Sequence, residues 1–342
     1  MSQQRIQSIL SPLAGILPLE KMVPGRKHRF LFPFWHAVSD IPPAHLMHLY
    51  RVPSVSDFVR DIDFFLKNFR AATTEQLIEH AYTGNKSQEK YFFPTFDDGL
   101  SECFHQIAPI LKKRGISAAF FINPEFVDNK ILFHRHKASL IINQLSSGKA
   151  SSLAKSEAER ILQQQSATKT LDSFLQQSSF SDHSMLDQLA AVFEIDFPEF
   201  LAREKPYMTL AQIKQMQSDG FLIGAHGLDH REFYHASASE IIHQISSSID
   251  FLMKEINPPI KSFAFPFTDF GVPDSVFEQV LQAGLWDLSF GTAGIKDDIR
   301  AHHLQRIPME AGDFTDARQL IRTEYLAWFL KKIIGKNKVR RQ

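Results

Sequence analysis

Residues 91–122 read YFFPTFDDGLSECFHQIAPILKKRGISAAFFI, and this stretch decides the predicted fold. The run Tyr91–Phe96 is short and apolar, which is typical of a buried strand. Residues 102–114 have helical spacing and end at Gly115, a common helix terminator. Ser117–Ile122 is a second apolar, strand-like run. A strand, a helix and another strand in close succession predict a βαβ unit with parallel strands.

The same alternation continues in both directions from this unit. The predicted strands lie at residues 29–35, 221–225, 261–266 and 288–291, and the predicted helices at 55–69, 209–219, 237–256, 273–283 and 315–331. This pattern predicts an α/β fold with a parallel sheet covered by helices, either open or closed into a barrel. In both cases the catalytic or binding residues should lie at the carboxyl ends of the strands.

The composition is that of a soluble globular protein with a large core. Of the 342 residues, 44% are hydrophobic and 22% are charged, and the length predicts two domains or one large barrel with an insertion. Basic and acidic residues number 38 each, so we expect no nucleic-acid partner. The only cysteine, Cys103, excludes an internal disulfide and a cysteine-based zinc cluster.

The sequence predicts a cytoplasmic protein. No apolar run approaches the roughly 18 residues that a membrane span requires. Residues 1–20 lack a basic segment followed by a clean apolar one, and Pro12 and Pro18 interrupt them, so we expect no secretion signal.

Two segments stand apart from the alternating pattern. Residues from about 126 to 205 are rich in Ser and Gln and read as mostly helical, so we interpret them as an insertion on one loop. It is either a lid or substrate-facing subdomain, or a flexible spacer, and its His134 and His136 are expected to be solvated. The tail 331–342 has six basic residues and no acidic one. It is either frayed or weakly attracted to an anionic membrane surface.

Candidate chemical groups follow two of the predicted strands. Asp97 and Asp98 come directly after Tyr91–Phe96, so one carboxylate can bind a metal while its neighbour acts as a base. His226 and His230 follow strand 221–225 with a spacing of four, which allows both imidazoles to share a metal. Fifteen histidines in 342 positions give about 0.7 such pairs by chance, so the pair alone is not evidence for a site, and Asp-Asp-Gly is by itself usually a turn. Their position at strand ends gives both motifs more weight.

Taken together and in order, these segments resemble the polysaccharide deacetylase family, also called the NodB-homology or carbohydrate esterase family 4 proteins. The matching segments are Phe34–Val38 (FWHAV), Thr95–Gly99 (TFDDG), Pro206–Phe221, His226–His230 (HGLDH) and Phe263–Phe267 (FAFPF). The resemblance covers about residues 30 to 310 apart from the insertion, and implies a single distorted (β/α) barrel over the chain.

The resemblance also implies a site. A divalent metal, most often zinc, would be held by Asp98, His226 and His230, with Asp97 as the general base. Such a metal would activate a water molecule and polarise the amide carbonyl. Pro266 and Phe267, in the third motif, would contact the substrate.

Two family features are missing. The third motif lacks its usual arginine, because Ser262–Phe265 stands there, and no histidine of segment 302–310 aligns with the usual general acid. We hypothesise that Arg306 replaces the missing cation beside Asp97. Two further residues, Trp286 and His36, are candidate substrate contacts. Ordinary packing between a helix and a strand explains Trp286 equally well. His36 either lines the substrate pocket or has a structural role.

The leading functional hypothesis is a metal-dependent hydrolase that removes an N-acetyl or other N-acyl group from an amino sugar in a polysaccharide or lipid-linked precursor. Removal of an O-acetyl group from a glycan and deformylation of a formamido sugar would use the same site. A non-catalytic saccharide-binding barrel is the alternative from another functional class.

Overall fold

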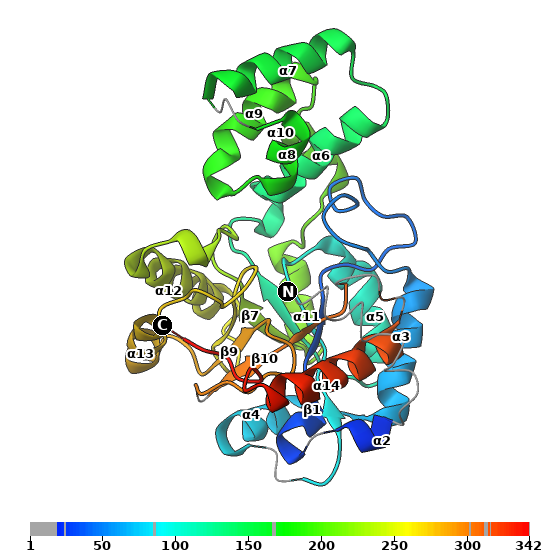
Figure 1. Cartoon of the computed structure of the whole chain (residues 1–342), viewed down its shortest axis with the longest axis vertical. Helices are drawn as coiled ribbons and strands as arrows, with labels where there is room; N and C mark the ends of the chain where they lie inside the picture. Colours follow the sequence, from blue (N-terminus) through cyan, green and yellow to red (C-terminus); the bar gives the residue numbers. More distant parts are fainter. Residues whose placement is uncertain are drawn as a thin grey trace.

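The computed structural model describes residues 19–341, except Pro24, 85–86, 166–168, Ala301, 311–313 and Thr315. The segment on which the secretion prediction rests therefore lies almost entirely outside the described residues. Figure 1 shows a barrel surrounded by helices, with a separate helical layer (green) above it. Among the described helices, none combines the length and apolar character that a membrane crossing needs.

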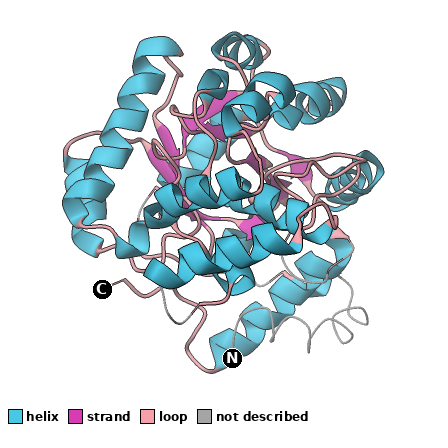
Figure 2. Cartoon of the chain, turned by 90° about the horizontal axis from the view of Figure 1, so that it is seen from above, coloured by secondary structure: helices cyan, strands magenta, loops and turns pink. Residues whose placement is uncertain are grey.

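Within the described residues, eight parallel strands form a nearly closed barrel, which Figure 2 shows from above inside its helices. In spatial order they are β10 (His303–Gln305), β9 (Leu288–Gly291), β8 (Ser262–Ala264), β7 (Leu222–Ala225), β6 (Ala119–Ile122), β5 (Thr95–Phe96), β2 (Pro33–Trp35) and β11 (Ile307–Pro308). The parallel α/β fold predicted from the alternating pattern, and the distorted barrel that the family resemblance implies, are thus confirmed.

One stretch of chain closes the barrel. β10 pairs with β9 and β11 pairs with β2, and Arg306 alone separates β10 from β11. The Arg306 amide donates to Gly291 O at 3.1 Å, and the Ile307 amide donates to Phe32 O at 2.9 Å. Neither strand was predicted, because each has only two or three residues and no alternating pattern of its own.

Two predicted strands are each divided into two. Residues 29–35 form β1 (Phe30–Leu31) and β2, and residues 91–96 form β4 (Tyr91–Phe92) and β5. β1 and β4 leave the barrel and join β3 (Arg70–Ala71) in a small parallel sheet. Pro33 and Pro94 lie at the divisions, where a residue without an amide hydrogen interrupts the strand ladder.

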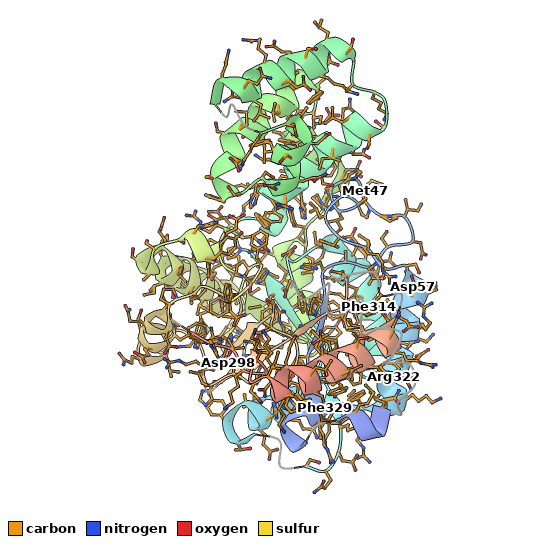
Figure 3. All side chains as sticks on the ribbon, in the orientation of Figure 1. Met47, Asp57, Asp298, Phe314, Arg322 and Phe329 are labelled. Carbon is orange, nitrogen blue, oxygen red and sulfur yellow. The ribbon has the colours of Figure 1, made fainter. Side chains whose placement is uncertain are left out.

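Helices cover the outside of the barrel. They are α2 (Leu19–Met22), α3 (Val55–Asn68), α4 (Thr74–Thr83), a π-helical turn (Cys103–Ile107) leading into α5 (Ala108–Lys113), α11 (Leu210–Ser218), α12 (Ala238–Glu255), α13 (Asp274–Gln282) and α14 (Ala317–Ile333). Short 3₁₀ turns occupy Arg26–Arg29, Val127–Asn129, Phe180–Asp182 and Phe233–His235. Thr209 and Ser237 begin α11 and α12 with capping boxes, as their spacing to Gln212 and Glu240 predicts. Figure 3 shows side chains filling the space between helices and strands.

The insertion is a packed helical layer above the barrel (Figure 1). It consists of α6 (His134–Ser146), α7 (Ser152–Gln165), α8 (Leu171–Gln177), α9 (His183–Val192) and α10 (Phe197–Glu204). Leu162, Phe174, Leu186 and Leu189 are at most 3% exposed and belong to a core separate from that of the barrel. The flexible-spacer alternative is therefore wrong for the described residues of this segment.

The prediction of solvated histidines in the insertion is also wrong. His136 is fully buried, and its Nδ1 lies 2.8 Å from the Tyr207 hydroxyl. His134 is 2% exposed, and its Nε2 lies 3.2 Å from Glu232 Oε1 on the barrel. Both residues lie in the first turn of α6, where the insertion meets the barrel, so the docked surface covers them.

Candidate metal centre and catalytic site

A tight turn after β5 positions the two carboxylates. Asp98 and Gly99 both have left-handed backbone angles, with φ of 70° and 64°. Few non-glycine residues adopt this conformation, and strained ones gather at functional sites. A side chain on Gly99 would also approach Ile122 Cγ2 to 3.2 Å. The turn thus places Asp97 and Asp98 together at the carboxyl end of the barrel, and both are at most 3% exposed.

The structure brings Asp98, His226 and His230 together. Asp98 Oδ1 lies 3.0 Å from His230 Nε2 and 3.5 Å from His226 Nε2. One ligand atom from each residue lies within 4.8 Å of the others, and all three side chains are buried. The two histidines come from the loop after β7, in which His230 also has a left-handed φ of 57°.

The orientation of His226 suits a metal ligand. Its Nδ1 lies 2.8 Å from Ala264 O, so the ring donates its hydrogen there and leaves the Nε2 lone pair facing Asp98. Asn123, at the end of β6, donates to His226 O at 2.6 Å and holds the loop. Burial lowers the pKa of His226 to about 4, so the ring stays neutral near pH 7.

The donor set fits a divalent cation. Asp98 Oδ1 is buried and has no hydrogen-bond partner of suitable geometry, although two imidazole nitrogens face it. Burying a carboxylate oxygen without a partner is costly, and a cation between the three ligands would remove that cost. One carboxylate and two histidines leave coordination positions open, and zinc accepts this kind of ligand set.

Arg306 forms a two-pronged ion pair with Asp97. Its Nη1 donates to Asp97 Oδ1 at 2.7 Å and its Nη2 to Oδ2 at 2.8 Å. The guanidinium is fully buried, and its centre lies 4.4 Å from the centre of the Phe34 ring. Burial alone would raise the pKa of Asp97, but the charge and hydrogen bonds of Arg306, together with the charges of His226 and His36, outweigh it and the pKa is lowered. The hypothesised contact with Asp97 is therefore present, and it keeps this carboxylate ionised.

His36 forms a second charged pair at the same end of the barrel. Its Nδ1 hydrogen-bonds to Glu310 Oε2, and its backbone amide donates to Glu310 Oε1 at 2.9 Å. Burial lowers the pKa of His36, but the charges of Glu310, Asp98 and Asp97 together raise it to about 9. Glu310 was not identified as a site residue from the sequence. It follows the short strand β11, which has no recognisable motif, so no sequence signal indicated it.

The remaining predicted substrate contacts lie in two different places. The Phe267 ring centre lies 4.6 Å from that of His230, with Pro266 just before it. Phe133, at the entry to the insertion, lies 4.5 Å from the same imidazole, so the insertion contributes to the site. Trp286 instead is 5% exposed and packs against Phe263, Phe265 and Phe277. These contacts agree with the alternative that Trp286 is a packing residue and not a substrate contact.

A second cluster also has metal-like ligands, but a cation already occupies it. Asp269, Asp298 and His303 come within 4.8 Å of one another, and the Arg341 guanidinium pairs with both carboxylates. The Arg341 side chain is only 2% exposed. This contact corrects the frayed-tail prediction, because the end of the described chain is bound to the barrel.

Comparison with known protein families agrees with the resemblance found in the sequence. The family model described as polysaccharide deacetylase matches residues 84–285, which is more than half of the chain. The match contains both carboxylates and both histidines but ends before Arg306 and Glu310. No curated protein matches the chain in sequence.

Similar solved structures share the fold at low sequence identity. The Streptococcus pyogenes deacetylase PplD, solved with acetate, is 15% identical, with a TM-score of 0.54 over 86% of this chain and 97% of that one. IcaB from Ammonifex degensii is 14% identical, with a TM-score of 0.53 over 86% and 96%. A de-N-acetylase from Aggregatibacter actinomycetemcomitans is 15% identical, with a TM-score of 0.51 over 83% and 96%.

Proposed function

The chain belongs to the polysaccharide deacetylase family, and from this premise we propose that it is a metal-dependent hydrolase that removes an N-acetyl group from an amino sugar. The observation that carries the proposal is the buried triad Asp98, His226 and His230 beside an Asp97 that Arg306 keeps ionised. Hydrolysis of an amide needs both a base and an activating cation, and this site has a place for each.

Asp98, His226 and His230 would hold the metal, for which zinc is our proposal. When bound, such an ion lowers the pKa of a coordinated water and polarises the carbonyl of the substrate. Asp97 accepts the water proton, since its ionised oxygens face the same space. His226 Nε2 lies 3.9 Å from Asp97 Oδ2, so base and ligands are close enough to share one water.

His36 is suited to donate the proton that the departing amine requires. An imidazole with a pKa of about 9 is protonated at neutral pH, and Glu310 holds its Nδ1 so that the opposite nitrogen is free to donate. The side chain is 23% exposed, which leaves it accessible to a bound substrate. His36 and Glu310 thus take the place of the aligned histidine that the chain lacks.

The substrate is proposed from the surroundings of the site. The Phe133 and Phe267 rings flank His230, and Phe267, which is 38% exposed, offers an apolar surface on which a sugar ring or an acyl methyl group can rest. PplD was solved with acetate, and the Aggregatibacter protein is named as a de-N-acetylase; these names support an N-acetylated saccharide as the substrate here.

The first experiment measures metal content and acetate release on the same preparations. We expect about one zinc-like ion per chain, lost in Asp98→Asn and in His226→Ala, and acetate release from N-acetylglucosamine oligomers. Asp97→Asn should keep the metal and lose turnover. His235→Ala, which removes an exposed histidine five residues after His230, is the matched control and should change neither.

Two outcomes would contradict the proposal. Protein without metal, even after reloading with zinc, cobalt or nickel, would exclude the hydrolase mechanism and favour a saccharide-binding barrel. A loaded enzyme that releases acetate only from O-acetylated glycans, or formate from formamido sugars, would correct the substrate while retaining the site.

A further inference from the structure

The C-terminal tail forms one wall of a cavity of about 440 Å³, which we call the tail cavity. The opposite wall comes from the loops that follow β8 and β9. The residues that line the cavity include four cationic residues and two threonines, namely Lys296, Lys336, Lys338, Arg340, Thr268 and Thr292. The cavity thus combines positive charge with hydrogen-bond donors.

Within the part of the chain that the structure describes, the four cations have no acidic partner at ion-pair distance. Among the described residues, no ion pair joins Lys296, Lys336, Lys338 or Arg340 to a carboxylate, whereas the neighbouring Arg341 pairs with Asp269 and Asp298. Uncompensated charges of one sign around a concavity raise the local concentration of counter-ions. An anionic ligand would therefore be favoured here.

The one carboxylate in the wall does not offset this charge. Asp269 accepts hydrogen bonds from His303 Nε2 at 3.2 Å, Gln305 Nε2 at 2.9 Å and Arg341 Nη2 at 2.9 Å. Its oxygens are thus already hydrogen-bonded to groups that do not line the cavity, and four cationic residues outnumber it in the wall. The four cations of the tail cavity therefore remain available to bind an anion.

The wall formed by the tail is held in place by its backbone. Asp297 N donates to Asn337 O at 3.0 Å, and Val339 N donates to Asp297 O at 2.8 Å. Arg341 adds its ion pair with Asp298, which Figure 3 labels on the barrel. A wall that is already ordered loses less conformational freedom when a ligand binds.

We propose that the tail cavity binds a phosphate or diphosphate group. Several cations around one space match an anion with more than one charge, and a guanidinium and ammonium groups donate well to phosphate oxygens. The Thr268 hydroxyl accepts from the Phe270 amide at 3.1 Å and can add its own hydrogen to the donor set, whereas the Thr292 hydroxyl donates to Phe267 O at 3.4 Å. The site is separate from the metal triad but near it, because Thr268 directly follows Phe267, whose ring contacts His230.

The test is calorimetric titration of the full-length, metal-loaded protein with pyrophosphate. Lys336→Gln/Lys338→Gln removes two cavity cations, and Lys130→Gln/Lys155→Gln removes the same charge from exposed positions elsewhere. Loss of even one charge-assisted hydrogen bond corresponds to about a tenfold change in affinity or more. We expect the dissociation constant to rise by at least that factor in the tail variant and to stay unchanged in the control.

Three outcomes would overturn the proposal. These are no binding at millimolar pyrophosphate, an equal loss of affinity in both double variants, and binding that Asp98→Asn abolishes but the tail variant retains. The last would place pyrophosphate at the metal triad. None of these results depends on acetate release, so a failure of this proposal can be distinguished from a failure of the proposed function.

Competition experiments identify the carrier of the phosphate. Uridine diphosphate and geranyl diphosphate present the same anion on a nucleoside and on a lipid chain. Preferential displacement of pyrophosphate by the first supports a nucleotide-linked ligand, and by the second a lipid-linked one. Both results support the site.

Discussion

Replacing Arg306 tests the central ion pair of the site. Arg306→Met keeps much of the side-chain length among the aromatic rings of Phe34 and Phe121 but removes the charge. Asp97 would then be a buried carboxylate without its two strongest hydrogen bonds. We expect a loss of stability and a raised pKa of Asp97.

The magnitude follows from the burial of both partners. Removing one member of a buried ion pair costs about 3–5 kcal/mol of unfolding free energy. With an unfolding entropy of about 2.1 cal/mol/K per residue over 342 residues, this corresponds to a decrease of about 4–7 °C in Tm. The folded-state pKa of Asp97 is lowered, so the pair stabilises the fold above the ordinary aspartate pKa, and its contribution is lost as the pH falls through the folded value.

The assay is a double-mutant cycle measured by urea unfolding and by kinetics. It compares the wild type, Arg306→Met, Asp97→Asn and the double variant. Asn has no charge to leave unpaired, so the double variant should recover most of the stability that Arg306→Met loses. In kinetics, Arg306→Met should move the acid limb of the pH profile of kcat/KM to higher pH, because Asp97 ionises less readily. Arg306→Lys should restore part of this shift.

Additive effects would refute the reasoning. If the two single substitutions sum to the double variant within about 0.5 kcal/mol, the residues are not coupled. An unchanged acid limb in Arg306→Met would show that Arg306 does not control the charge of Asp97.

Three further predictions concern other parts of the structure. Glu310→Gln removes the main charge that raises the pKa of His36, so the alkaline limb of the rate profile should move to lower pH; an unmoved limb would exclude His36 as the proton donor. Burial raises the pKa of Asp61 to about 6, so ionisation of this one carboxyl should cost about 2–3 kcal/mol of stability between pH 4 and 7; urea unfolding should therefore show the stability of Asp61→Asn rising by that amount relative to wild type over this range, and a constant difference would contradict the assignment. Gly224→Ala should lower Tm, at a cost of about 1–3 kcal/mol, because the added Cβ would lie 2.5 Å from ring atoms of Phe121; an unchanged melting curve would contradict this packing.

The local pattern of the sequence was sufficient for the parallel α/β fold, and the family resemblance added the closed barrel and half of the site. Apolar runs, helical spacing and capping residues have periods of a few residues, and the barrel strands β6 to β9 follow them closely. Asp97 and Asp98, like His226 and His230, are neighbours in the chain. They could be recognised because each pair directly follows a strand whose end must lie at one edge of the barrel.

Contacts between distant parts of the chain were established only by the tertiary structure, and of these only the pairing of Arg306 with Asp97 had been hypothesised from the sequence. Arg306 reaches Asp97 across 209 positions, and Glu310 reaches His36 across 274. Both come from the irregular stretch that closes the barrel, where strands of two or three residues leave no periodic signal. The burial of His136 and the docking of Arg341 likewise depend on which surfaces meet. Sequence periodicity reports which side of an element is buried, whereas the partner of a buried charge depends on how the elements assemble.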